Sequence, residues 1–80
     1  MDYIVRADYY PNGKMIPLAI TDCHGISLYV RRIEKIVADG EMRYVCSMSN
    51  YERYSIVFRE NTWYVKRISI KSPEMNSYLP

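Results

Sequence analysis

Apolar and polar residues alternate in six short stretches of this chain, and together these stretches leave no room for a long helix. Alternation at every second position is typical of a β-strand that buries one of its two faces. The predicted strands cover residues 3–10, 14–21, 26–38, 42–48, 53–59 and 63–70. The pattern therefore predicts an all-β protein.

Turn residues separate the predicted strands and keep the connections short. The Pro-Asn-Gly tripeptide at 11–13 is the strongest signal, because proline presets φ while asparagine and glycine tolerate a positive φ. The Asp-Gly pair at 39–40 predicts a further hairpin. Short connections favour antiparallel neighbours. Pro17 cannot donate a hydrogen bond to a neighbouring strand, so we expect the second strand at a sheet edge or beside a bulge.

The stretch at 26–38 has an ambiguous period. It alternates as a strand up to Val30, but its later apolar residues would also line one side of a helix. We expect a long strand with a bulge or sharp bend near Arg31 and Arg32, where the alternation shifts by one residue. A short helical turn at 32–37 is the alternative.

Phase changes of this kind let a small sheet coil on itself. The last stretch has another one, because Trp63 and Val65 alternate first, and Ile68 and Ile70 continue out of phase. We expect a small, partly open antiparallel barrel of five to six strands, SH3-like or OB-like, over residues 1–70. The polar segment 71–80, which contains prolines, is expected to be a short C-terminal tail.

Composition places the chain among small folded proteins. Its 80 residues suffice for one domain, and 49% hydrophobic residues predict a folded rather than a disordered chain. The first residues lack the features of a signal peptide, and no apolar run is long enough to cross a membrane. Cys23 and Cys46 are too few for a disulfide scaffold. We therefore expect a cytoplasmic protein with no membrane partner.

The net charge is +2, and the cations concentrate in the second half of the chain. They are Arg31, Arg32, Lys35, Arg43, Arg53, Arg59, Lys66, Arg67 and Lys71. Arginines on adjoining strands would form a patch that suits phosphate or carboxylate partners. The glutamates at 34, 41, 52 and 60 favour cross-strand ion pairs instead, and we prefer that interpretation.

Tyrosine is unusually frequent, with nine in 80 residues. Neighbours in a strand point to opposite faces, so the doublets Tyr9-Tyr10 and Trp63-Tyr64 are each expected to place one ring inward and one outward. Outward tyrosines near arginines are typical of protein interfaces and of surfaces that stack bases. Tyrosines also cover the ends of small barrels, and this structural role is the commoner one.

Cys23 and His24 are the only adjacent nucleophile and base. A zinc site needs more ligands than these two offer, and Cys46 does not complete a tetrahedral set. Catalysis by such a pair requires convergent side chains and a third group that orients the base, for which Asp22 is the nearest candidate. We expect no catalytic residues, no metal and no cofactor.

Short motifs at 2–4, 12–18, 43–46 and 63–65 resemble a group of short, uncharacterised bacterial proteins. That group has Asp-Gly-x-Ile-x-Pro-Leu, Arg-Tyr-x-Cys and Trp-aromatic-Val segments. The resemblance spans most of residues 2–65 and implies no activity. Arg31 falls where the group has an acidic residue, and 36–41 is shorter than its small-residue loop, so no role based on charge is carried over.

These observations favour a non-enzymatic protein-interaction module with an unknown protein partner. The expected binding residues are Tyr10, Tyr51, Tyr64, Arg31, Arg32, Arg53 and Arg67. Binding of single-stranded nucleic acid by the same residues is the alternative. A cysteine-dependent enzyme at Cys23 and His24 is the least favoured hypothesis. Unpaired sheet edges also allow a homodimer.

Overall fold

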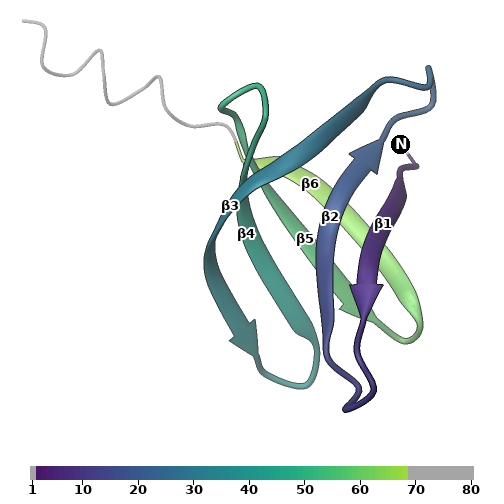
Figure 1. The fold of residues 1–80 in the computed structure, drawn as a ribbon, viewed down its shortest axis with the longest axis vertical. Coiled ribbons are helices and arrows are strands. Elements are labelled where there is room, and N and C mark those ends of the chain that lie inside the picture. The colour runs from purple at the N-terminus through teal and green to yellow at the C-terminus, as the bar shows by residue number, and fades with distance from the viewer. Residues whose placement is uncertain (1, 69–80) are drawn as a thin grey trace, which may run out of the picture.

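The computed structural model describes residues 2–68, which form six strands and no helix (Figure 1). The strands are β1 (Ile4–Tyr9), β2 (Met15–Thr21), β3 (Ser27–Ala38), β4 (Met42–Met48), β5 (Arg53–Arg59) and β6 (Thr62–Ile68). Each strand pairs antiparallel with the next, so the sheet order follows the chain from β1 to β6. Within residues 2–68 no helix is long and apolar enough to span a membrane. The predicted all-β class is confirmed.

The boundaries of the first five strands lie within one residue of those predicted from the alternation. The stretch at 26–38 forms β3 over nearly its whole length, so the alternative of a helical turn at 32–37 is wrong. Pairing with β4 explains this outcome, since Ile33 lies opposite Cys46 and Ile36 lies opposite Tyr44 in the ladder. The predicted end of the last strand at 69–70 and the predicted tail at 71–80 lie outside the described residues.

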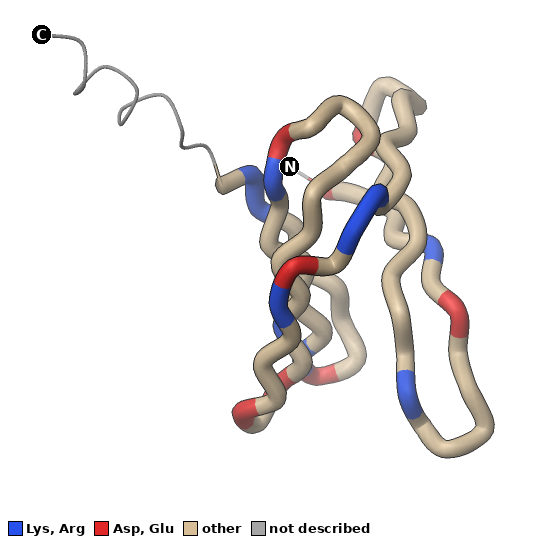
Figure 2. The backbone as a smooth tube through the Cα atoms, turned by 60° about the vertical axis from the view of Figure 1, so that its left-hand side comes forward, with Lys and Arg blue, Asp and Glu red and all other residues tan. Residues whose placement is uncertain are grey.

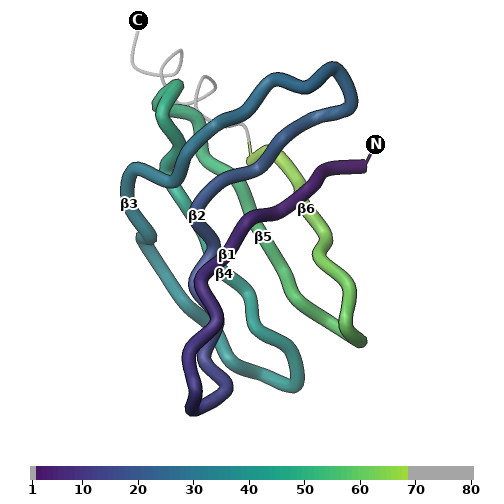
Figure 3. Tube along the Cα trace, turned by 45° about the vertical axis from the view of Figure 1, so that its right-hand side comes forward, coloured from purple at the N-terminus to yellow at the C-terminus, as the bar shows by residue number. Residues whose placement is uncertain are grey.

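Two bulges bend β3. Its register with β4 skips Arg31, between Val30 and Arg32, and then skips Glu34, between Ile33 and Lys35. Each bulge adds local twist, so the first part of β3 pairs with β2 and the rest with β4. The sheet therefore curls into a half-barrel (Figure 3), and the predicted bulge near Arg31 is confirmed. β6 pairs with β5 in unbroken register, so the phase change expected there produces no bulge within Thr62–Ile68.

Pro17 lies beside a third bulge. The register of β1 with β2 shifts between Arg6 and Ala7, which leaves Leu18 without a partner residue on β1. β2 itself lies inside the sheet, so a bulge rather than an edge accommodates the proline. The ladder of β2 with β3 begins only at Ala19, and the missing N–H of Pro17 therefore interrupts no pairing with β3.

The concave inner face of the half-barrel holds the core. Its buried side chains are Ile20, Tyr44, Cys46, Met48, Tyr54 and Ile56. The Tyr44 hydroxyl donates a hydrogen bond to the backbone carbonyl of Met15, which ties β4 to β2 across the core. Burial, reinforced by the nearby Cys46 sulfur, raises the pKa of Tyr44 above its ordinary value of 10.0.

β1 and β6 are the two edge strands, and they meet through side chains rather than through backbone pairing. Just before β1, the ring of Tyr3 packs edge to face on Tyr54 of β5, with centroids 6.4 Å apart. The indole Nε1 of Trp63 donates a hydrogen bond of 3.4 Å to the hydroxyl of Tyr9. A cleft of about 480 Å³ remains between the first residues of β1 and the first half of β6.

Candidate interaction surface

The curl of the sheet leaves β3 to β6 with an outer face that is rich in cations. On β4 and β5 the residues that alternate with the buried Tyr44, Cys46 and Ile56 point to this face. We call it the basic face and define it by seven side chains: Arg31, Arg32, Lys35, Arg43, Arg53, Arg59 and Lys66. In Figure 2 charged positions follow closely along the strands of this part of the chain, whereas the β1–β2 hairpin is mostly uncharged.

Cross-strand pairing sets the order of residues on the basic face. One row across the strands runs Arg32, Ser47 and Arg53. The next row runs Lys35, Val45, Ser55 and Lys66. The third row runs Arg43, Val57 and Tyr64. Small residues therefore occupy the middle of the row from Lys35 to Lys66, and the arginines of β4 and β5 lie in the rows on either side of it.

The middle of the basic face is a shallow trough. Ser47 and Val57 point outward but are buried, and Arg31 covers Ser47 through a hydrogen bond. A hollow of about 190 Å³ lies over Val57 and Ser55, and Arg43, Arg59 and Lys66 line it together with the carboxylate of Glu41. An extended chain fits such a trough better than a bulky ligand does.

Two glutamates hold four of the arginines in place. Glu34 accepts a hydrogen bond of 2.9 Å from Nε of Arg53 and lies 3.8 Å from Nη2 of Arg32. Glu41 lies 2.7 Å from Nη2 of Arg43 and 3.6 Å from Nη1 of Arg59. The sequence-based preference for cross-strand ion pairs is confirmed for Arg53 and Arg59, whereas Arg32 and Arg43 each pair with a glutamate two residues away in the chain. Because the pairs are exposed, each contributes only about 0.2–1 kcal/mol to stability.

Lys35 and Lys66 form no ion pair among residues 2–68, and neither does Arg31, which contacts Ser47 and Tyr51 instead. The two lysines lie in the same row on opposite sides of the trough. Three strand spacings separate them, which corresponds to about 14 Å. With seven cations against the carboxylates of Glu34 and Glu41, the basic face carries most of the positive charge of the described chain.

Two tyrosine rings on this side of the molecule are covered by guanidinium groups. The Arg31 guanidinium lies 4.5 Å from the ring centroid of Tyr51, and that of Arg59 lies 4.4 Å from the centroid of Tyr64. Arg31 also donates a hydrogen bond of 2.8 Å to the hydroxyl of Ser47. Each contact is a cation–π pair, so a guanidinium covers one face of each tyrosine ring.

The structure brings most of the predicted binding residues together. Arg31, Arg32, Arg53 and Tyr64 lie on the basic face, and Tyr51 lies at its end in the β4–β5 turn. Arg67 pairs with Tyr54, so it belongs to the inner side, where it lies 3.4 Å from Glu52.

Tyr10 lies apart from the basic face, in the β1–β2 turn. The expectation for its doublet is wrong, because Tyr9 and Tyr10 are 63% and 47% exposed. Strand β1 ends at Tyr9, so the alternation of faces does not continue into the turn. The Trp63-Tyr64 doublet behaves as predicted, with Trp63 packed against the core and Tyr64 outward.

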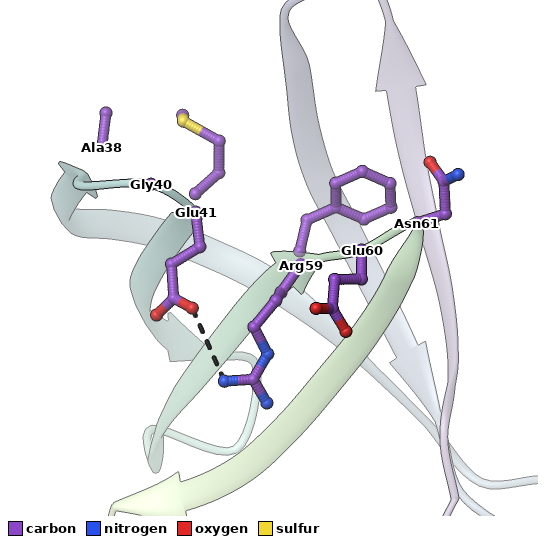
Figure 4. A pocket seen from close by; sticks show the side chains of 8 residues that line it. Ala38, Gly40, Glu41, Arg59, Glu60 and Asn61 are labelled. Atoms are coloured by element: carbon purple, nitrogen blue, oxygen red, sulfur yellow. Dashed lines mark ion pairs between the residues drawn. The ribbon is translucent and has the colours of Figure 1, made fainter.

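A second hollow, of about 510 Å³, lies at the open end of the half-barrel between the β3–β4 and β5–β6 turns. Figure 4 shows Glu41 reaching toward Arg59 at its rim, with Glu60 and Asn61 on the turn beside them. Met42 and Phe58 supply its apolar lining. The hollow adjoins the basic face through the shared residues Glu41 and Arg59.

The segment with Cys23 and His24 forms an exposed turn between β2 and β3. One Asp22 carboxylate oxygen accepts hydrogen bonds of 2.9 Å from the backbone N–H groups of both His24 and Ile26. These bonds, chiefly the one from Ile26, lower the pKa of Asp22 below its ordinary value of 3.8. The carboxylate therefore acts as a turn cap. In residues 2–68 no three His, Cys, Asp or Glu side chains gather to hold a metal ion.

Sequence analysis alone does not identify the trough or the two lysines at its sides. Lys35 and Lys66 are far apart in the chain, and only the register of three neighbouring ladders places them in one row. Two bulges in β3 determine that register for Lys35. The alternation pattern signals the bulge at Arg31 but gives no sign of the one at Glu34.

In comparisons with known proteins, no protein family, curated protein or solved structure matches this chain. The resemblance to short bacterial proteins therefore stays a prediction. The fold and the surface define a small antiparallel half-barrel that presents a cationic sheet face with a shallow central trough.

Proposed function

We propose that this protein is a non-enzymatic interaction module that binds an extended, acidic segment of a partner protein on the basic face. The observation that carries the proposal is the row of Lys35, Val45, Ser55 and Lys66, in which two unpaired cations flank a floor of small residues. The trough gives room for an extended backbone, and the lysines give carboxylates a partner on each side.

The ion pairs on the basic face support this proposal. Glu34 and Glu41 hold the arginines of β3, β4 and β5 close to the sheet, so the guanidinium groups are already oriented when a partner arrives. Pre-organised side chains lose less conformational entropy on binding. An acidic partner adds carboxylates to clusters that still carry an excess of positive charge.

The geometry favours an acidic peptide over single-stranded nucleic acid. Proteins that bind single strands without sequence preference use open aromatic rings on which bases stack. The floor of the trough consists of serine and valine, and Tyr51 and Tyr64 each have a guanidinium on one ring face. Carboxylates need only the cations, whereas bases need a stacking platform.

The two free thiols, one exposed and one buried, agree with a reducing compartment such as the cytoplasm.

Fluorescence anisotropy with a labelled peptide of alternating Glu and Ser residues tests the proposal. We expect binding that weakens as salt rises, and a loss of at least about tenfold in affinity for the double variant Lys35→Glu/Lys66→Glu. Lys14→Glu/Arg67→Glu, which alters two cations outside the basic face and outside β1, is the matched control and should retain affinity within about twofold.

Two outcomes would overturn the proposal. One is an equal loss of affinity for both double variants, since binding would then follow net charge rather than the basic face. The other is tighter binding of oligothymidylate of the same length than of the peptide, which would identify nucleic acid as the ligand class.

A further inference from the structure

The outer edge of β1 lacks the lysines, prolines and bulged residues that protect many edge strands. Such strands are blunted by lysines, prolines or bulged residues of their own. β1 has no lysine or proline, and the bulge beside it places its extra residue, Leu18, on β2. The other edge strand, β6, carries Lys66 and Arg67. Edge protection is therefore asymmetric in this molecule.

Exposed apolar side chains concentrate in the first part of the sheet, from β1 to the start of β3. Of the nine large hydrophobic residues that are exposed in the described chain, six lie between Ile4 and Tyr29. Ile4 is 71% exposed, and Tyr9 is 63% exposed. The charged side chains of β1 itself are one cation and one anion, Arg6 and Asp8. Among residues 2–68, neither forms an ion pair.

The ladder with β2 determines which backbone groups of β1 face outward. In an antiparallel pair, successive residues turn their N–H and C=O groups alternately toward the neighbour and away from it. The N–H of Tyr10 donates to the carbonyl of Lys14, so Tyr10 faces β2. Counting back by twos, Asp8, Arg6 and Ile4 also face β2. The intervening residues Val5, Ala7 and Tyr9 present their backbone groups at the free edge.

A second copy of β1 satisfies these backbone groups in several registers, and the register centred on Ala7 matches opposite charges along the whole strand. With the twofold axis at Ala7, Val5 lies opposite Tyr9 of the other copy in a hydrogen-bonded pair. Arg6 then lies opposite Asp8 of the other copy, and Asp8 opposite its Arg6. These are non-hydrogen-bonded positions, at which side chains approach most closely.

The neighbouring registers bring like charges together. A twofold axis at Arg6 places that arginine opposite itself, and an axis at Asp8 does the same for the aspartate. An axis at Val5 places Asp2 opposite Asp8. Like charges directly opposite each other destabilise a strand pair. Of these four registers, only the one centred on Ala7 places the opposite charges of β1 against each other.

We propose that two copies of this protein pair along β1, antiparallel about Ala7, and join their half-barrels into one continuous sheet with two reciprocal Arg6–Asp8 ion pairs. The pairing also places Ile4 opposite Tyr10 of the other copy, so the exposed apolar side chains at the ends of β1 are covered. The basic face lies on β3 to β6 and takes no part in the strand pairing.

Analytical ultracentrifugation over a range of concentrations tests this proposal. We expect the protein to form a dimer, and Arg6→Asp and Asp8→Arg each to raise the dimer dissociation constant at least about tenfold, because each places two like-charged pairs at the interface. An equimolar mixture of the two variants should recover the dimer. In that mixed dimer every cross-strand pair has opposite charges again.

The control is Lys35→Glu/Lys66→Glu, which alters the basic face and should leave the dimer unchanged. Circular dichroism establishes that each variant keeps the β-sheet spectrum. A protein that is monomeric at all concentrations, a dimer that survives both charge reversals, or a mixture that stays monomeric would each overturn the proposal. Because the peptide experiment uses different residues, either proposal can fail without the other.

Discussion

At the scale of single residues, the two cysteines have opposite environments. Cys46 is fully buried beside Tyr44 and Met48 in the core, whereas Cys23 lies in an exposed turn. Burial, with a smaller effect from the charge of Glu34, raises the pKa of Cys46 from 9.0 to about 11. The thiolate is the reactive form of cysteine, and at pH 8 only about one Cys46 in a thousand would be ionised.

We therefore expect one fast-reacting thiol per folded chain. Ellman's reagent at pH 8 should modify Cys23 within the first phase and modify Cys46 only after unfolding. The variant Cys23→Ser should show no fast phase in the folded protein and one reactive thiol in denaturant. Two fast phases in the native wild-type protein would contradict the burial of Cys46.

The hydroxyl of Tyr44 is a second residue with a clear energetic role. It donates to the backbone carbonyl of Met15, so Tyr44→Phe leaves that carbonyl without this partner. We expect the substitution to lower the free energy of unfolding by about 1–3 kcal/mol. Tyr64→Phe is the matched control, because its ring faces outward, and it should cost less than about 0.5 kcal/mol. Urea denaturation of the three proteins measures both values.

Ionisation of the same hydroxyl is expected to make the free energy of unfolding depend on pH in the alkaline range. Since folding raises the pKa of Tyr44 above 10.0, its contribution to stability is complete below pH 10 and is lost as the pH rises through the folded-state pKa. The stability difference between wild type and Tyr44→Phe should therefore shrink above pH 10. A difference that stays constant up to pH 12 would show that Tyr44 ionises equally in both states.

At the scale of elements, the bulges of β3 set the shape of the sheet. Because Arg31 is an extra residue in β3, Val30 and Arg32 lie opposite consecutive residues of β4, Met48 and Ser47, although they are two positions apart in the chain. Deleting Arg31 would slip one part of β3 by a residue and turn its side chains to the opposite faces. We expect the deletion to reduce the free energy of unfolding by more than about 3 kcal/mol, a large fraction of the stability of a small domain.

Arg31→Ala is the control for this deletion, since it keeps the bulge and removes only the contacts with Ser47 and Tyr51. It should cost about 0.5–1.5 kcal/mol. Thermal unfolding followed by circular dichroism compares the two variants. Equal losses for both would mean that the side chain of Arg31, and not the extra backbone residue, is what β3 requires.

The strands are the level at which sequence analysis succeeds best here. Alternation and turn residues are local properties, and they identify all six strands and the bulge near Arg31. The bulge at Glu34 and the exposure of both Tyr9 and Tyr10 are missed, because they depend on the partner strand and on where β1 ends. The row from Lys35 to Lys66 is a product of three registers and has no local signature.

At the scale of the whole molecule, charge and apolar surface are separated. The cations collect on the outer face of β3 to β6, whereas six of the nine exposed large hydrophobic residues of the described chain lie between Ile4 and Tyr29. This separation is consistent with two independent surfaces, one for an acidic partner and one for a second copy of the chain. In the proposed dimer the two basic faces belong to one assembly, so a partner with two acidic segments would gain affinity through multivalency.

The most direct test of the central claim is a titration of ¹⁵N-labelled protein with the alternating Glu and Ser peptide, followed by NMR. The account predicts that the amide signals of the middle of the basic face, at Val45, Ser47, Ser55 and Val57, shift together with those of Lys35 and Lys66. Signals of the β1–β2 hairpin should stay in place. Shifts confined to that hairpin, or the absence of any shift on β4 and β5 at saturating peptide, would contradict it.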